Sequence, residues 1–174
     1  MEHGIIIETV RLRLRRFRED DLNDLYEYLS DPEVVRYEPY QPATPAEAKD
    51  SLVWRISTEE MIAVELKRCG KLIGNVYLGK REFASLEIGY VFNRAYWGQG
   101  FAKEGCAALI DAAFSHGIHR IFAECDPENK ASWKLLEALG FVREAHLRKN
   151  VYFWKDEQGS PIWKDTYIYA RLRN

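Results

Sequence analysis

The sequence predicts one mixed α/β domain in which helices flank a mostly antiparallel sheet. Over residues 19–29, apolar side chains recur at the three- and four-residue spacing of an amphipathic helix; from Met61 the apolar period changes to two. Three alternating segments then follow one another through short turns, as in an antiparallel meander. No internal repeat or linker interrupts the chain, so residues 1–174 are expected to form a single domain.

Ahead of the meander, the chain is expected to form one strand and two helices. Residues 11–17 alternate leucine with arginine, which predicts a half-buried strand. Residues 19–29 have helical spacing, and this helix should end before Pro32 because the residue preceding proline avoids the helical region. Thr44 and Glu47 form a capping box that starts the second helix.

The meander and the C-terminal half supply the remaining elements. Strands are expected over 61–66, 72–78 and 86–92, with a turn after Cys69 and another near Gly79. The pattern then predicts a helix over 101–114, a strand over 120–125, a helix over 131–139, and two long strands between 141 and 172 around a turn at 156–161.

Composition narrows the classes of function. The 25 Lys+Arg and 27 Asp+Glu residues leave a net charge of −2, which argues against a dedicated nucleic-acid binder. Cys69, Cys106 and Cys125 make no CxxC pair, and His116 and His119 lack a third ligand, so no disulfide framework or metal site is expected. The first eight residues lack the basic segment of a signal peptide, and no apolar stretch could span a membrane. A cytoplasmic location without membrane attachment is therefore expected.

The most informative segment is 93–104, where a strand ends, two glycines follow and a long helix begins. Backbone N–H groups at such a turn converge on one space, and the helix N-terminus adds positive potential. Gly98, Gly100 and Ala102 are small enough to let phosphates approach. A pyrophosphate cradle and a plain strand-to-helix turn both fit this pattern. A dinucleotide fingerprint fits poorly, because Lys103 stands at its third glycine.

The second half of the pattern carries a family resemblance. Gly98-Gln99-Gly100-Phe101-Ala102 is followed, after a strand, by Asn129, Ser132 and Leu139-Gly140-Phe141. This combination resembles the GNAT N-acetyltransferase superfamily, in particular its branch of ribosomal-protein N-acetyltransferases. Leu12–Arg15, Asp31–Val34 and Asp165–Tyr169 are also similar to that branch. The resemblance implies a sheet splayed between its fourth and fifth strands, with acetyl-CoA wedged into the opening.

The resemblance also implies a cofactor site. Pantetheine would pair with backbone near Val91 and Phe92, and the diphosphate would lie on the turn before the long helix. The residues implied at the turn are Trp97, Gly98, Gln99, Gly100, Phe101, Ala102 and Lys103, with Asn129 and Ser132 contributing from the next helix. Trp97 departs from the family, which often has Gln or Arg there. The backbone cradle survives this change because it uses amide groups.

Acetyl transfer needs a base for the amine and a proton for the departing thiolate. Many family members use a tyrosine as the acid, but Leu136 occupies that place here. Ser132, one turn earlier on the same face, is the expected acid; the alternative is a serine bonded to its own helix backbone. Glu87 is the expected base, acting through a water, with Glu124 as a second possibility. Val151 stands where the ribosomal branch has an acidic base.

The acceptor should lie across the opening. Aromatic side chains that could line it are Tyr37, Tyr40, Trp54, Tyr152 and Trp154, although each could equally belong to the core. The expected reaction moves an acetyl group from acetyl-CoA to a primary amine, foremost the N-terminal α-amine of a protein or peptide. A small-molecule amine and a non-catalytic acyl-CoA-binding role are the alternatives. No nucleic acid or membrane partner is expected, and the chain would be a monomer or a homodimer.

Overall fold

The computed structural model describes residues 5–173. The expected domain over residues 1–174 and the expectation for the first eight residues include positions 1–4 and 174, which lie outside the described residues. The elements are β1 (Ile5–Glu8), β2 (Leu12–Arg15), α1 (Leu22–Leu29), α2 (Pro45–Ser57), β3 (Met61–Leu66), β4 (Lys71–Arg81), β5 (Ser85–Phe92), α3 (Phe101–Ser115), β6 (Arg120–Cys125), α4 (Lys130–Ala138), β7 (Val142–Val151) and β8 (Lys164–Leu172). Within residues 5–173, no helix is long and apolar enough to cross a bilayer.

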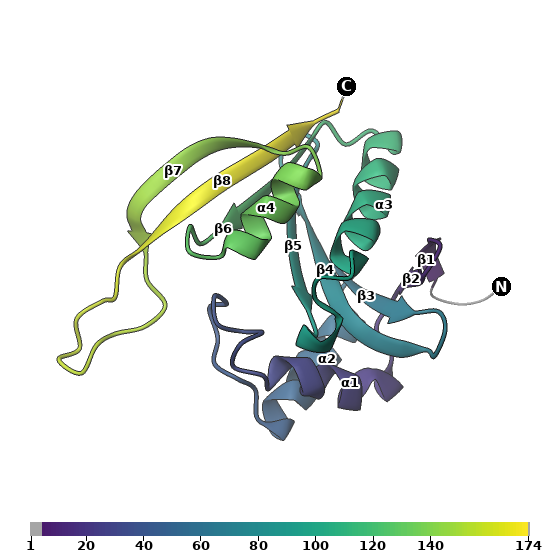
Figure 1. Ribbon diagram of the computed structural model, residues 1–174, viewed down its shortest axis with the longest axis horizontal. Helices are drawn as coiled ribbons and strands as arrows, with labels where there is room; N and C mark the ends of the chain where they lie inside the picture. The colour runs from purple at the N-terminus through teal and green to yellow at the C-terminus, as the bar shows by residue number, and fades with distance from the viewer. Residues whose placement is uncertain (1–4, 174) are drawn as a thin grey trace.

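The strands form an eight-stranded sheet in the order β1-β2-β3-β4-β5-β6-β8-β7. The β5–β6 pair is parallel and the other neighbours are antiparallel. The β5–β6 ladder ends at the Glu87–Phe122 pair, whereas β5 continues to Phe92 and β6 to Cys125, so the two strands diverge (Figure 1). The mixed sheet and its splay between the strands expected at 86–92 and 120–125 are thereby confirmed.

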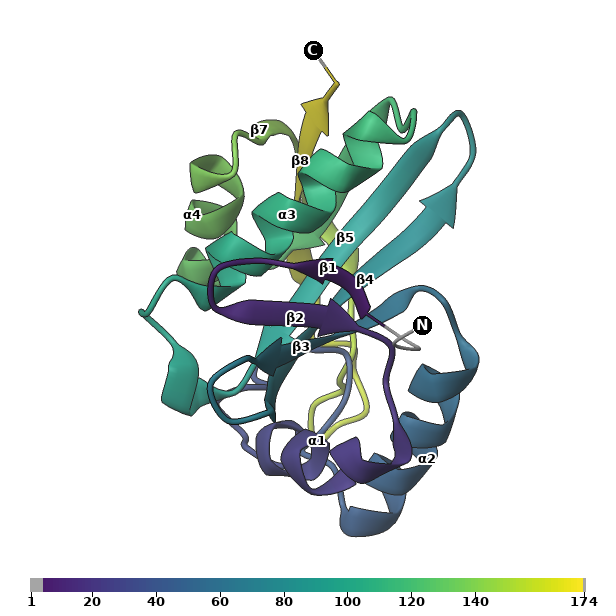
Figure 2. The same ribbon diagram turned by 90° about the vertical axis from the view of Figure 1, so that its right-hand side faces the viewer.

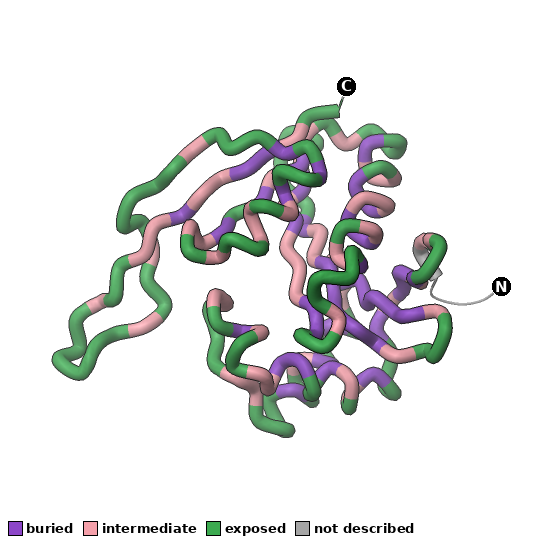
Figure 3. Tube along the Cα trace, viewed as in Figure 1, coloured by how far each residue is buried: buried purple, intermediate pink, exposed green. Residues whose placement is uncertain are grey.

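Helices cover the sheet on both faces, and each face has its own apolar cluster. One cluster packs α3 and α4 against the sheet, and the other packs α1 and α2 (Figure 2). In β3, Ile62 and Val64 belong to the first cluster, while Met61 and Ala63 belong to the second. The predicted alternation in this strand therefore separates two buried faces, and all six of its residues are buried. Buried positions gather along the central strands, whereas β7 and the loop that follows it are mostly exposed and β8 is largely half-buried or buried (Figure 3).

Two expectations about the strands differ from the structure. The turn predicted near Gly79 lies further on, because β4 continues to Arg81 and Gly79 stays paired with Glu87. A Cβ atom at Gly79 would overlap the Tyr77 ring, so this glycine makes room for a side chain within the strand. The turn itself is at Phe83 and Ala84, which have φ values of +57° and +51°. Strand β1 was not expected from the sequence.

The expected helix over 19–29 begins as a 3₁₀ turn at Glu19–Asp21, and the α-helix starts at Leu22. The carboxylate of Asp21 accepts two hydrogen bonds from the Arg15 guanidinium, at 2.7 and 2.8 Å, and one from the Arg18 backbone N–H at 2.9 Å. Arg15 also donates to Glu65 at 2.7 Å. This buried network joins β2, β3 and the start of α1.

The second helix begins as the capping box predicts. The Thr44 hydroxyl accepts from the Glu47 N–H at 3.3 Å, and the Glu47 carboxylate accepts from the Thr44 N–H at 2.8 Å. Pro45 is the first helical residue, where its missing N–H costs nothing.

Candidate active site

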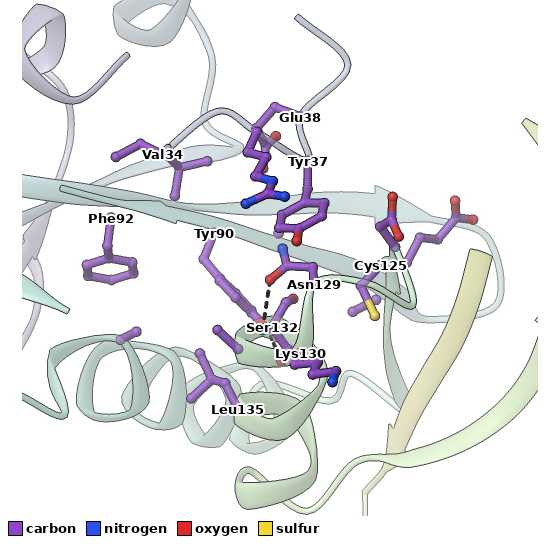
Figure 4. Close-up of a pocket in the computed structure, with 18 of the residues that line it drawn as sticks. Val34, Tyr37, Glu38, Tyr90, Phe92, Cys125, Asn129, Lys130, Ser132 and Leu135 are labelled. Carbon is purple, nitrogen blue, oxygen red and sulfur yellow. Dashed lines mark hydrogen bonds between the residues drawn. The ribbon is translucent and has the colours of Figure 1, made fainter. Parts of the chain in front are cut away.

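The divergence of β5 and β6 opens a cleft of about 990 Å³ (Figure 4). Its walls come from the loop after α1, the end of β5, the turn before α3, the β6–α4 connection and the base of the β7–β8 hairpin. Segments distant in sequence thus meet at the point where the sheet ladder breaks. The walls of such a cleft can hold two substrates against each other.

One wall of the cleft is the glycine turn before α3. Gly98 and Gly100 have φ values of +70° and +81°, a backbone region that favours glycine, and a Cβ atom at Gly98 would meet open space. The N–H of Glu104 bonds the Gly100 carbonyl at 3.0 Å, so the N–H groups of residues 101–103 precede the first turn of hydrogen bonds within the helix. Amides at a helix N-terminus suit a diphosphate, so this turn fits the diphosphate group of acetyl-CoA.

Arg11 holds this turn against β2. Its Nη1 donates to the Gln99 carbonyl at 3.0 Å, its Nε donates to Glu104 at 2.6 Å, and its guanidinium lies 4.2 Å from the centre of the Phe101 ring. Burial alone would raise the pKa of Glu104, but hydrogen bonds from Thr9 and Arg11 outweigh it and lower the pKa. The turn is therefore fixed by a charged contact outside the cleft.

The end of β5 presents backbone groups to the opening. The Asn93 N–H donates to the Ile73 carbonyl on β4 at 2.9 Å. Because the direction of the backbone groups alternates along a strand, the N–H and C=O of Val91 point toward β4 and those of Phe92 point toward the opening. The Phe92 carbonyl accepts the indole N–H of Trp97 at 2.8 Å. Trp97 thus caps the end of the open strand edge.

Ser132 enters the cleft from the first turn of α4. Asn129 caps this helix, and its Oδ1 accepts the Ser132 N–H at 3.2 Å. The Tyr90 hydroxyl lies 2.9 Å from the Ser132 carbonyl oxygen and 3.1 Å from Ser132 Oγ (Figure 4). Leu136, at the place of the family's tyrosine, is fully buried. Ser132 is therefore a hydroxyl that α4 presents to the cleft.

Seven carboxylates line the cleft, and three of them, Glu38, Glu87 and Glu124, bear on the chemistry. Glu87 is paired with Arg81, which also bonds the Tyr77 hydroxyl. Burial, together with the negative charge of Glu87, raises the pKa of Glu124. Burial raises the pKa of Glu38 to about 7, although nearby Tyr40 and Arg55 act in the opposite direction. These groups give this part of the cleft acidic character.

The structure brings together most of the residues implied by the resemblance. Those lining the cleft are Glu87, Val91, Phe92, Trp97, Gly98, Gly100, Phe101, Ala102, Lys103, Asn129, Ser132 and Tyr37. Gln99 lies outside the lining, where its side chain donates to the Ala95 carbonyl.

Four of the expected acceptor aromatics also lie outside the cleft lining. Trp54 is 51% exposed on α2, and Tyr40 is partly exposed in the loop before that helix. Tyr152 packs edge-on against Trp163 in the β7–β8 loop. Trp154 lies in the same loop, where its carbonyl accepts the Ile162 N–H.

Tyr90 and Glu38 are among the cleft residues that sequence reasoning missed. Tyr90 occupies one of the core-facing positions of its strand. The alternation of apolar residues along that strand predicts that its side chain packs in the core and does not indicate a polar contact. Its phenol was the one available signal, because a buried tyrosine hydroxyl usually finds a partner. Glu38 lies in an irregular loop, where no periodicity predicts which way a side chain points.

A splayed sheet with an amide-lined turn and a hydroxyl in one cleft suits a transferase of the acyl-CoA-dependent class. Residues 11–142 match the acetyltransferase (GNAT) domain family, and the chain belongs to that family. It is an acetyl-transfer enzyme that uses acetyl-CoA.

Relatives extend this assignment across the chain. The uncharacterized N-acetyltransferase YnaD of Bacillus subtilis (strain 168) is 34% identical over 172 residues, covering 95% of this chain and 96% of the relative. The crystal structure of a GNAT-family acetyltransferase from Bacillus anthracis is 31% identical with a TM-score of 0.87, covering 96% of this chain and 98% of that one.

More distant structures share the fold. A ribosomal L7/L12 α-N-protein acetyltransferase, RimL, in complex with coenzyme A is 20% identical with a TM-score of 0.80, covering 97% of both chains. Spermidine N-acetyltransferase from Vibrio cholerae, in complex with CoA and spermine, is 22% identical with a TM-score of 0.77, covering 95% of this chain and 97% of that one.

Proposed function

We propose that this enzyme acetylates a primary amine, and that the N-terminal α-amine of a protein or peptide is its acceptor. The observation that carries the proposal is that one cleft is lined by the amide-lined turn, by Ser132, and by both the loop after α1 and the base of the β7–β8 hairpin, which would border its open side. The acceptor would enter from that open side. A cytoplasmic enzyme, monomeric or homodimeric, is part of the same proposal.

The chain's own groups would hold acetyl-CoA along one wall. The amides of Phe101–Lys103 would bind the diphosphate, and the left-handed glycines of the turn leave it room. The open edge of β5 at Phe92 would pair with pantetheine. The side-chain amide of Asn129, whose oxygen caps α4, would add a donor. When bound, acetyl-CoA supplies an activated acetyl group as its thioester.

Two side chains would move the protons. Ser132 Oγ holds the proton that the departing sulfur requires, at the N-terminal end of α4 where the helix dipole favours negative charge. Glu87, held in place by Arg81, would take the proton of the amine through a water. Glu124 is the second candidate for the base, since its raised pKa brings it closer to neutral pH.

The shape of the open side supports an extended acceptor. Tyr37 borders it from the loop after α1, and Val151 and Phe153 border it from the hairpin. A chain terminus can pass between two such loops. The carboxylates Glu38 and Glu124 favour a second candidate, a small cationic amine, because an ammonium group would pair with them. RimL and the spermidine enzyme represent these two acceptor classes on the same fold.

The experiment incubates the enzyme and acetyl-CoA with a peptide carrying a free N-terminal alanine, with the same peptide N-terminally blocked, and with spermidine. Products are measured by mass spectrometry, because the exposed thiol of Cys69 would react with a thiol reagent. We expect acetylation of the free peptide alone. Acetylation of spermidine alone would favour the second candidate, and no product despite CoA binding would overturn the catalytic proposal.

The acid is tested with Ser132→Ala. Loss of a general acid should lower kcat about 100-fold while the dissociation constant of CoA stays within about twofold. Full turnover in this variant would exclude Ser132 as the acid. Glu87→Gln and Glu124→Gln compare the two candidate bases in the same assay.

A further inference from the structure

Tyr90 reaches across the opening from β5 to α4. It lines the cleft, and its hydroxyl contacts two atoms of one residue, the carbonyl oxygen and Oγ of Ser132, at 2.9 and 3.1 Å. The two residues are 42 positions apart in sequence. Tyr90 therefore connects the β5 wall of the cleft to the α4 wall, and it does so at the proposed acid.

The two hydroxyls can exchange the roles of donor and acceptor in this contact. The Tyr90 hydroxyl has one hydrogen and two acceptor lone pairs, and so has the Ser132 hydroxyl. When Tyr90 donates to the Ser132 carbonyl, its oxygen can accept the Ser132 proton. When Ser132 Oγ–H turns into the cleft, a lone pair of Oγ faces Tyr90, and the Tyr90 hydroxyl can donate to it. The pair thus offers a hydrogen bond to Ser132 in either orientation.

The surroundings keep Tyr90 neutral. Burial raises its pKa well above the ordinary value of a tyrosine, and the hydrogen bond to Ser132 lowers it only in part. Its ring packs beside the larger apolar cluster. Tyr90 therefore remains a hydrogen-bond donor over the pH range in which the enzyme would work.

We propose that Tyr90 is a positioning residue for acetyl transfer, acting through Ser132 by holding its hydroxyl and donating to Oγ when that hydroxyl turns toward the reacting sulfur. The proposal rests on the proposed role of Ser132 as the acid. A purely structural role of Tyr90 would be to pack β5 against α4, so the test must separate packing from positioning.

The chain contains a matched control for packing. Tyr28 donates its buried hydroxyl to Asn75 at 2.8 Å, between α1 and β4 and outside the cleft lining. Tyr28→Phe deletes a buried hydroxyl and Tyr90→Phe a part-buried one, and both variants keep the ring. Both should lower the midpoint of thermal unfolding by a few degrees. Only Tyr90→Phe should change catalysis.

The test measures kcat, KM for acetyl-CoA, the calorimetric dissociation constant of CoA and the unfolding midpoint. The probe acceptors are the alanine peptide and spermidine. Tyr90→Phe should lower kcat about tenfold, the effect of one hydrogen bond, with both acetyl-CoA KM and CoA affinity within about twofold of wild type. In a Ser132→Ala background, Tyr90→Phe should have little further effect on kcat, because the effects of substituting two residues that act together are not additive.

The outcomes separate this inference from the proposed function. If Ser132→Ala slows turnover but Tyr90→Phe does not, the inference alone fails. An equal loss of kcat from Tyr28→Phe, or an undiminished effect of Tyr90→Phe in the Ser132→Ala background, also overturns it. If Ser132→Ala keeps full turnover, or wild type acetylates neither probe, the proposed function fails and the inference fails with it.

Discussion

Arg11 offers the sharpest test of the cofactor turn, because it supports the turn without lining the cleft. Replacement by methionine removes the guanidinium and keeps part of the apolar stem. The variant loses the hydrogen bond to the Gln99 carbonyl, the pair with Glu104 and the contact with Phe101. Each of these contacts holds the segment that would bind the diphosphate.

The magnitude follows from these contacts. Because the Arg11 side chain is 42% exposed, the Gln99 hydrogen bond should contribute about 1 kcal/mol, the Phe101 contact about 0.5 kcal/mol and the Glu104 pair about 0.5 kcal/mol. Arg11→Met should therefore lower the free energy of unfolding by about 2 kcal/mol. If about 1.4 kcal/mol of this holds the turn in its binding conformation, the dissociation constant of CoA rises about tenfold.

Arg13→Met is the matched control. Arg13 lies two residues further on, in β2, is 38% exposed, and pairs with Glu8 and Glu65, each at 3.1 Å. It should lower stability and leave CoA affinity unchanged. Urea unfolding and calorimetric titration with CoA measure both quantities. Equal loss of CoA affinity in the two variants, or none in Arg11→Met, would refute the reasoning.

Three further predictions concern the turn, the cleft and the core. Gly100→Val places a branched side chain at a φ of +81° and should weaken CoA binding at least about tenfold by calorimetry; unchanged affinity would exclude the cradle. Burial raises the pKa of Glu38 to about 7 from 4.5, so the folded protein keeps a proton that the unfolded chain releases, and stability falls as pH rises between these values. Glu38→Gln should therefore stabilise by about 1 kcal/mol at pH 8, after discounting for partial exposure, and much less at pH 5 in urea unfolding; an equal gain at both pH values would contradict the raised pKa. Arg15→Met leaves the buried carboxylates of Asp21 and Glu65 without their shared partner and should cost about 3–5 kcal/mol in urea unfolding, and a cost under about 1 kcal/mol would contradict this account.

Local signals were sufficient for most elements. The strands expected at 61–66 and 120–125 have those bounds, and the capping box places the start of α2 at Pro45. These features depend on spacing and on contacts within one turn, which a sequence displays directly. The turn predicted near Gly79 is wrong, because glycine marks turns more often than it makes room for a neighbouring ring.

The sequence by itself determined the alternation of strands and helices, the glycine turn at 98–100 and the helix that carries Ser132, because each depends on neighbours in the chain. Tertiary structure alone decided that Arg11 holds the turn, that Glu38 enters the cleft and that Tyr90 meets Ser132. These contacts depend on which strands pair and where their ladder stops. The β5–β6 ladder ends at Glu87, and sequence periodicity carries no information about that end point.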